Sequence, residues 1–302
     1  MITVLGPTAI GKTAFAAQLA HRIGGEVISA DSRQVYRGMD IGTGKDYEDY
    51  IVEGEVVPYH LVDIVEPGYE YNVYEFQHDF LKVYEDIVSR DKIPVMCGGT
   101  GMYLEAVLNG YKLLKVPDNR KLRNRLESKT MEELKGLFES FKSPHNLTDI
   151  TDRKRLLRAI EIADYYQEHE ASVQGFPKIS SITFGIHFDR SLIRERITAR
   201  LKKRMGEGMT SEIKDLLKKG ITPGQLKFYG LEYNFLTQYE LGEISKEEMF
   251  RLLNTAIHQF AKRQMTWFRR MEKRGHQIHW IDGRLPLEEK IEVALRIAQN
   301  EQ

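Results

Sequence analysis

A phosphate-binding pattern opens the chain, where residues 6–13 read Gly-Pro-Thr-Ala-Ile-Gly-Lys-Thr and fill every required position of G-x-x-x-x-G-K-[ST]. Glycines in such a loop let backbone N–H groups converge on phosphate oxygens, and a helix that starts there adds positive potential. Because an apolar run precedes this stretch and a helical pattern follows it, we predict a phosphate loop rather than a chance glycine turn. In that loop Lys12 supplies a charge and Thr13 a hydroxyl for Mg²⁺. The predicted loop comprises Gly6, Pro7, Thr8, Ala9, Ile10, Gly11, Lys12 and Thr13.

Two further polar side chains follow apolar runs that predict strands. Asp31 comes directly after residues 27–30, and Thr100 follows residues 93–97 and two glycines. Open α/β sheets bind ligands at the carboxyl ends of their strands, so both side chains are candidates for the site. A carboxylate beside a phosphate loop can act as a general base. Asp31 could equally hold Mg²⁺ or cap a turn, and Thr100 could simply cap a tight Gly-Gly-Thr turn.

The sequence lacks one feature of ordinary P-loop NTPases. These proteins hold magnesium with an aspartate near the end of an apolar strand, whereas residues 93–97 lead into Gly-Gly-Thr with no acid. Asp63, inside the apolar run 61–65, is a displaced alternative. No residue is recognisable as a device that orients a hydrolytic water. The pattern therefore favours a transferase with a bound acceptor over a motor or a switch.

The residues around these motifs predict the elements that position them. Up to residue 108, strands are expected at 2–5, 27–30, 61–65 and 93–97, and helices at 13–23, 72–90 and 101–108. The helix from residue 72 begins with a capping box, Asn72 to Glu75. Strands that alternate with helices predict an α/β fold with a doubly wound parallel sheet, similar to that of P-loop NTPases.

The pattern changes near residue 117, after which helices follow one another. The later predicted elements are helices at 118–127, 130–141 and 151–169, a strand at 182–188, helices within 191–219 and at 245–274, a strand at 279–281 and a helix at 286–299. We therefore predict a catalytic core from residues 1–112 and 180–302, with a helical carboxy-terminal region. Residues 113–179 are predicted to form an inserted, mostly helical domain.

Composition excludes several classes of protein. The 302 residues are 41% hydrophobic, enough for a sizeable core, and Cys97 is the only cysteine, which excludes an intrachain disulfide framework and a Cys-rich zinc site. Because Cys97 lies in an apolar run, we expect a buried, inert thiol. No apolar run approaches the roughly 18 residues of a membrane span, and the glycine motif starts too early for a signal peptide. We expect a cytoplasmic protein that does not enter a membrane.

The formal net charge is zero, but the charges are unevenly distributed. Residues 45–90 carry 12 acidic and 3 basic side chains, whereas residues 153–158 carry 4 basic and no acidic ones. Residues 262–274 carry 6 basic side chains and 1 acidic one. Basic clusters of this kind are typical of surfaces that bind nucleic-acid phosphates, and equally of solvated helix faces.

Five stretches together resemble one family, the tRNA dimethylallyltransferases, also called tRNA isopentenyltransferases, in a form typical of bacteria. They are residues 6–13, 31–43 (Asp-Ser-Arg-Gln-Val-Tyr-Arg-Gly-Met-Asp-Ile-Gly-Thr), 98–100, 152–161 and 262–269, in the family's order. The resemblance extends over nearly the whole chain and is far more specific than the phosphate loop alone. It implies transfer of the dimethylallyl group from dimethylallyl diphosphate to N6 of the adenosine 3′ to a tRNA anticodon.

The resemblance also implies roles for individual residues. Asp31 takes the position of the general base, Thr100 orients the acceptor, and Lys12, Thr13 and Mg²⁺ stabilise the departing diphosphate. The inserted domain is implied to bind the tRNA anticodon stem-loop. The implied tRNA contacts are Asp31, Ser32, Arg33, Gln34, Thr100, Arg123, Arg155, Arg158, Lys262 and Arg263. We expect the enzyme to be a monomer.

One departure from the family concerns the diphosphate site. Glu232 stands where many members have an arginine, which puts a cationic contact in doubt; Lys227 is a candidate replacement if it shares a helical face with Gly230. Three rival functions stay open. They are an adenylate isopentenyltransferase, which needs no basic clusters, a small-molecule kinase of the P-loop type, and a catalytically weak tRNA-binding paralogue.

Overall fold

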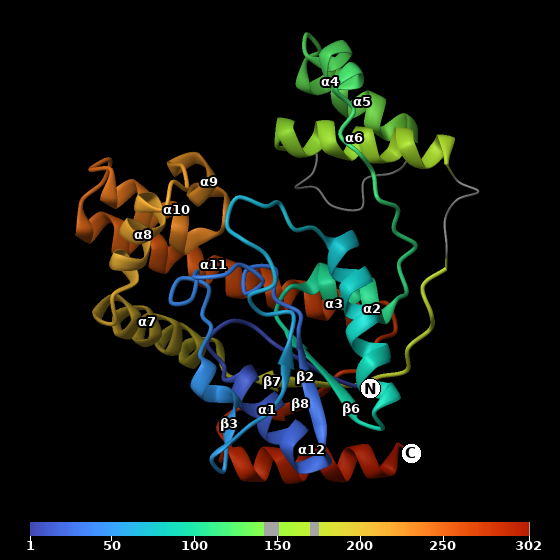
Figure 1. Cartoon of the computed structure of the whole chain (residues 1–302), viewed down its shortest axis with the longest axis vertical. Helices are drawn as coiled ribbons and strands as arrows, with labels where there is room; N and C mark the ends of the chain where they lie inside the picture. Colours follow the sequence, from blue (N-terminus) through green and yellow to red (C-terminus); the bar gives the residue numbers. More distant parts are fainter. Residues whose placement is uncertain (142–150, 170–174, 302) are drawn as a thin grey trace. The chain divides into compact units, whose positions relative to one another are not determined.

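A computed structural model of the chain describes residues 1–141, 151–169 and 175–301. These residues form two compact units, one from residues 1–109 with 178–302 and the other from residues 110–177 (Figure 1). Parts of the predicted insert, residues 142–150 and 170–174, lie outside the described residues. Across the described ranges, no helix combines the length and apolar character that a bilayer span requires.

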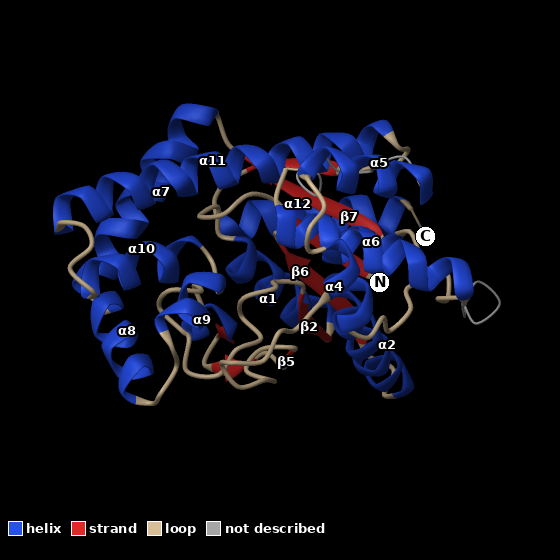
Figure 2. Ribbon diagram, turned by 90° about the horizontal axis from the view of Figure 1, so that it is seen from above, coloured by secondary structure: helices blue, strands red, loops and turns tan. Residues whose placement is uncertain are grey.

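A six-stranded sheet lies at the centre of the first unit, with all neighbouring strands parallel (Figure 2). Its strands run in the order β5-β2-β6-β1-β7-β8. Their bounds are β1 (Ile2–Leu5), β2 (Gly25–Ser29), β5 (Tyr59–His60), β6 (Ile93–Gly98), β7 (Ile182–His187) and β8 (His279–Asp282). A separate antiparallel hairpin pairs β3 (Ile51–Val52) with β4 (Glu55–Val56). The predicted parallel α/β architecture is confirmed.

Helices cover both faces of this sheet. The bounds of four of them are α1 (Lys12–Ile23), α2 (Val73–Ser89), α3 (Gly101–Leu108) and α12 (Leu287–Asn300). Residues of α1 and α12 share one apolar cluster with Val27 and Val95 of the sheet. Since side chains alternate along a strand, Ile28 and Met96 face the other way, and α2 contacts both of their strands. The sheet is therefore buried on both sides, as its continuous apolar strands require.

The strand predicted at residues 61–65 is wrong. Pairing with β2 is made by β5 instead, and the segment that follows contains Leu61 and Asp63 at φ of 61° and 54°. These left-handed conformations are incompatible with an extended strand. Val65 forms only an isolated bridge to Tyr36. The segment thus contributes apolar side chains from a turn, and of these Leu61 is buried.

Five helices form the rest of the first unit. Their bounds are α7 (Arg190–Gly206), α8 (Met209–Lys218), α9 (Pro223–Phe228), α10 (Leu231–Glu240) and α11 (Lys246–Lys273). Buried residues of all five form a second apolar cluster, which also contains Val35, Tyr36 and Met39. The helices therefore pack around the segment that follows Asp31, so they position the distinctive stretch 31–43.

The second unit is a small helical body. Its described helices are α4 (Arg120–Leu126), α5 (Met131–Phe141) and α6 (Arg153–Glu168), close to the predicted helices. Leucines of all three helices bury one another with Ile160. Asp152 caps α6 by accepting a hydrogen bond of 2.8 Å from the amide of Arg155. The unit thus has its own apolar core.

Candidate active site

Three neighbouring strands end at one edge of the sheet and bring the predicted site residues together there. Strand β1 leads into the phosphate loop, β2 into Asp31, and β6 into Thr100, and the three are adjacent in the order β2-β6-β1. The amide of Ser32 donates to Thr100 Oγ1 at 3.1 Å, and the amide of Arg33 donates to Asp31 Oδ1 at 2.8 Å. Asp31 and Thr100 are half-buried, so both stay accessible to a ligand.

The phosphate loop adopts a conformation that favours glycine at two positions. Gly6 and Gly11 have φ of 149° and 83°. Lys12 Nζ donates to the Pro7 carbonyl at 2.7 Å, which folds the lysine back over the loop. Desolvation lowers the pKa of Lys12 to about 8, and the negative charge of Asp31 opposes that fall. An anionic ligand bound at this loop would therefore stabilise the charged form of Lys12.

Cys97 lies under this loop and plays no part in its chemistry. The side chain is buried, as expected, and burial raises the pKa of the thiol to about 12. A protonated thiol is a poor nucleophile.

Gln264 is a site residue that the sequence pattern did not single out. It lies on α11 and is 7% exposed. Its Oε1 accepts from the Thr8 amide at 2.9 Å, and its Nε2 donates to the Gly99 carbonyl at 2.9 Å. One side chain thus ties the phosphate loop to the turn before Thr100. The only sequence signal for this residue was its position inside the family-like stretch 262–269.

The segment after Asp31 is anchored by a second residue that sequence reasoning missed. Glu212, on α8, accepts from the amides of Asp40, Ile41 and Gly42 at 2.7, 2.7 and 3.0 Å. Its Oε1 also accepts from the Tyr233 hydroxyl at 2.6 Å. A carboxylate with four donors stabilises one conformation of this loop strongly.

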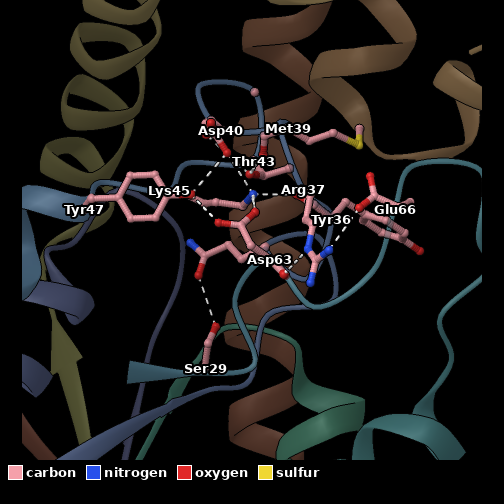
Figure 3. A network of polar contacts seen from close by, with 12 residues as sticks. Ser29, Tyr36, Arg37, Met39, Asp40, Thr43, Lys45, Tyr47, Asp63 and Glu66 are labelled. Atoms are coloured by element: carbon pink, nitrogen blue, oxygen red, sulfur yellow. Dashed lines mark hydrogen bonds and ion pairs between the residues drawn. The ribbon is translucent and has the colours of Figure 1, made fainter. Parts of the chain in front are cut away.

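A buried ammonium also holds this segment (Figure 3). Lys45 is 8% exposed and donates to the Tyr36 carbonyl at 2.5 Å and to Asp40 Oδ1 at 2.9 Å. It also pairs with the carboxylate of Asp63, which in turn accepts from the Tyr47 hydroxyl at 2.5 Å. Asp63, the displaced magnesium ligand considered from the sequence, is therefore engaged as the counter-ion of Lys45.

The other residues of the predicted tRNA segment are half-buried beside Asp31. Gln34 accepts from Ser29 Oγ at 3.1 Å and donates to the Gly44 carbonyl at 3.1 Å. The guanidinium carbon of Arg33 lies 5.5 Å from the centroid of the Phe228 ring. Arg33 therefore presents its charge next to an exposed aromatic surface.

Lys227 and Glu232 lie in different charged surroundings. Lys227 Nζ donates to both carboxylate oxygens of Glu243 at 2.9 Å, so this lysine is paired with an acid of its own surroundings. Desolvation raises the pKa of Glu232, and the charges of Arg204 and Arg200 oppose that rise. Both arginines belong to α7.

In the second unit, two of the predicted tRNA-binding arginines have structural partners. Arg123 Nε contacts Glu161 at 2.6 Å, and Arg158 Nη1 contacts the same carboxylate at 3.1 Å. Glu161 is 2% exposed, so the two arginines neutralise a buried charge. Arg155, in contrast, is exposed, as are Lys262 and Arg263 on α11 of the first unit.

The described residues contain no group of three or more His, Cys, Asp or Glu side chains arranged to hold a metal. Thr13 lies in the first turn of α1, directly after Lys12. Magnesium often keeps several waters and binds through ligand phosphates with few protein groups. The donor set here therefore fits a magnesium ion carried mainly by a phosphorylated ligand.

Comparisons with known proteins identify the family of this chain. The IPP transferase family model matches residues 34–271, and the isopentenyl transferase model matches residues 1–55. A protein of Parabacteroides distasonis named tRNA dimethylallyltransferase 1 is 58% identical over 301 residues, which cover 100% of this chain and 98% of that protein. The tRNA dimethylallyltransferase 2 of Bacteroides fragilis is 56% identical over 96% of this chain and 95% of its own length.

Solved structures show the same relationship. The tRNA delta(2)-isopentenylpyrophosphate transferase of Staphylococcus epidermidis has a TM-score of 0.71 and 30% identity, covering 100% of this chain and 99% of its own. A eukaryotic dimethylallyltransferase acting on tRNA has a TM-score of 0.79 over 99% of this chain and 79% of that chain, and at 23% identity it shows the fold alone. Because a family model matches well over half of the residues and a relative is 58% identical along the full length, the chain belongs to the IPP transferase family.

Proposed function

We propose that the chain transfers the dimethylallyl group of dimethylallyl diphosphate to N6 of the adenosine 3′ to the anticodon of a tRNA. The observation that carries this proposal is the position of Asp31 beside the phosphate loop and Thr100, at one edge of the sheet. A base, an acceptor-orienting hydroxyl and a diphosphate cradle are the three parts that such a transfer needs. The names of the full-length relatives support the same reaction.

The proposed chemistry is a substitution at C1 of the donor. The N6 lone pair forms a bond to C1 as the bond between C1 and the diphosphate oxygen breaks, and the diphosphate leaves with that electron pair. Asp31 accepts the proton that N6 loses, and Thr100 orients the amine. Negative charge grows on the leaving group, so Lys12 and the loop amides are placed where preorganised donors are most effective.

Magnesium fits this proposal through Thr13. Its hydroxyl would contact an ion held mainly by the diphosphate and by water. Bound there, the ion would supply charge stabilisation to the leaving group.

The proposed acceptor is a tRNA anticodon stem-loop, bound by a monomer. Exposed cations at Arg155, Lys262 and Arg263 are suited to phosphate contacts, which would make binding dependent on salt. The target base must leave its stack to reach Asp31. Ser32, Arg33 and Gln34 adjoin Asp31 and are proposed to contact the loop around that base. A free adenylate acceptor would not require the exposed cations.

The test is to incubate the protein with unmodified tRNA, dimethylallyl diphosphate and Mg²⁺ in nucleotide-free buffer, and then to analyse the nucleosides by mass spectrometry. Formation of N6-(dimethylallyl)adenosine supports the proposal. Parallel reactions replace tRNA with AMP, or the prenyl donor with ATP. Product only with AMP would support an adenylate isopentenyltransferase, and phosphoryl transfer from ATP would support a kinase.

The Asp31→Asn variant tests the general base. We expect single-turnover transfer to fall about 10²- to 10⁴-fold, because an amide cannot accept the proton. Affinities for tRNA and for the donor, measured on the same preparation, serve as controls and should stay close to those of the wild type. Transfer at the wild-type rate would remove Asp31 from this role.

A further inference from the structure

Position 232 raises a question about the diphosphate site, because Glu232 stands where the resemblance to the family implies an arginine. A carboxylate near a bound diphosphate would weaken its binding unless other cations compensated for it. The Lys227 ammonium pairs with Glu243, so its charge is already balanced there. The charges of Arg204 and Arg200, both on α7, instead favour the ionised form of Glu232.

Helix α7 presents three arginines on one face. Arg196, Arg200 and Arg204 are spaced four residues apart, which places them on successive turns of the same side. Arg196 Nε donates to the Ala9 carbonyl of the phosphate loop at 2.9 Å. This contact brings α7 against the phosphate loop, and Arg200 follows one helical turn later on the same face.

The two inner arginines are held in fixed orientations. Arg200 Nη2 pairs with Asp46 Oδ2 at 2.6 Å, and Arg204 Nη2 pairs with Asp46 Oδ1 at 2.8 Å. A Cβ at Gly44 would lie 2.8 Å from Arg204 Nη1 and 3.0 Å from Arg200 Nη2, so both guanidinium groups pack closely against this turn. One carboxylate shared by two guanidinium groups leaves donors that can bind a further anion.

We propose that Arg200 and Arg204 form the cationic half of the diphosphate site, opposite Lys12, and take the place of the arginine that is absent at position 232. The inference rests on the proposed function. Asp46 acts as a positioning residue, because its two oxygens hold one guanidinium group each. Arginine suits this task, since its planar fork binds two phosphate oxygens at once. The family's charge arrangement is thereby redistributed, with the cations on α7 and the acid on α10.

The experiment measures the dissociation constant of inorganic pyrophosphate with Mg²⁺ by calorimetry. We expect Arg200→Gln and Arg204→Gln each to weaken binding at least tenfold. The matched control is Lys202→Gln, which removes an exposed charge from the same helix and should leave the dissociation constant unchanged. Arg204 is 8% exposed, so its variant is checked by thermal unfolding; Arg200 alone carries the test if that variant does not fold.

A rescue separates binding from a purely structural role. In the Arg200→Gln background, Glu232→Arg restores an arginine at the family's position, and we expect it to recover most of the lost pyrophosphate affinity. Unchanged affinity in Arg200→Gln, in a protein whose wild type modifies tRNA, would overturn the inference. Failure of the rescue would also count against it. If the wild type modifies no tRNA but Arg200→Gln still loses pyrophosphate, the proposed function fails and the anion site stands.

Discussion

The lowered pKa of Lys12 predicts that diphosphate binding depends on pH. Desolvation places this pKa at about 8 in the free protein, so the ammonium is about 9% deprotonated at pH 7 and about 91% at pH 9. A bound diphosphate keeps the lysine charged, because it supplies the opposite charge that the buried site lacks. Only the charged form binds well, so the dissociation constant should rise about tenfold between pH 7 and pH 9.

The same linkage predicts proton uptake. At pH 8 half of the lysines are neutral, so binding should take up about 0.5 proton per site. Calorimetry in two buffers with different ionisation enthalpies measures this number directly, with dimethylallyl diphosphate and Mg²⁺ as the ligand. The Lys12→Arg variant is the control, because a guanidinium stays charged across this range. Its dissociation constant, whatever its value at pH 7, should be nearly independent of pH, and its proton uptake at pH 8 should be close to zero.

Two results would refute this reasoning. One is a wild-type dissociation constant that is the same at pH 7 and pH 9, with no proton uptake at pH 8. The other is an equal pH dependence in Lys12→Arg, which would assign the titration to the ligand or to another group.

Four further variants test residues of the candidate site and of the second unit. Glu212→Gln should lower the free energy of unfolding by about 1–3 kcal/mol in urea titrations, because three loop amides lose a charged acceptor; unchanged stability would mean that the loop is held by other contacts. Gln264→Leu leaves an amide of the phosphate loop without its partner, so pyrophosphate affinity should fall at least several-fold with the circular dichroism spectrum retained, and wild-type affinity would contradict this. Arg158→Gln should cost about 1–3 kcal/mol of stability because it removes one of the two arginine partners of the buried Glu161. Arg155→Gln should change stability by less than about 0.5 kcal/mol but reduce both tRNA affinity and its salt dependence. A larger loss of stability in Arg155→Gln than in Arg158→Gln would contradict these two roles.

Much of the fold could be predicted from local patterns. The four residues of β1 were located to the residue, and the capping box of Asn72 and Glu75 is formed as expected. The alternation of strands and helices was sufficient to predict a parallel sheet, since the crossover connections between parallel strands are strongly constrained. The strand expected at 61–65 failed for a local reason, because an apolar run does not reveal the left-handed residues within it.

The sequence by itself determined the parts of the candidate site that lie in a local motif or directly after a predicted strand. The spacing from Gly6 to Thr13 specifies a phosphate loop, and Asp31 and Thr100 follow strands that must end at the same edge. Their chemistry follows from residue type and from the geometry of a parallel sheet. These features depend on short-range conformation, which local residue types largely set.

Only the tertiary structure decided which distant side chains complete the site. Gln264 meets Gly99 across 165 positions of sequence, and Glu212 meets Gly42 across 170. The partners of Arg200 and Lys227 likewise depend on how α7 and α9 pack, and neither could be read from helical spacing alone. The physical reason is that charge and hydrogen-bonding capacity are properties of single residues, whereas their partners are set by the packing of helices that are far apart in the chain.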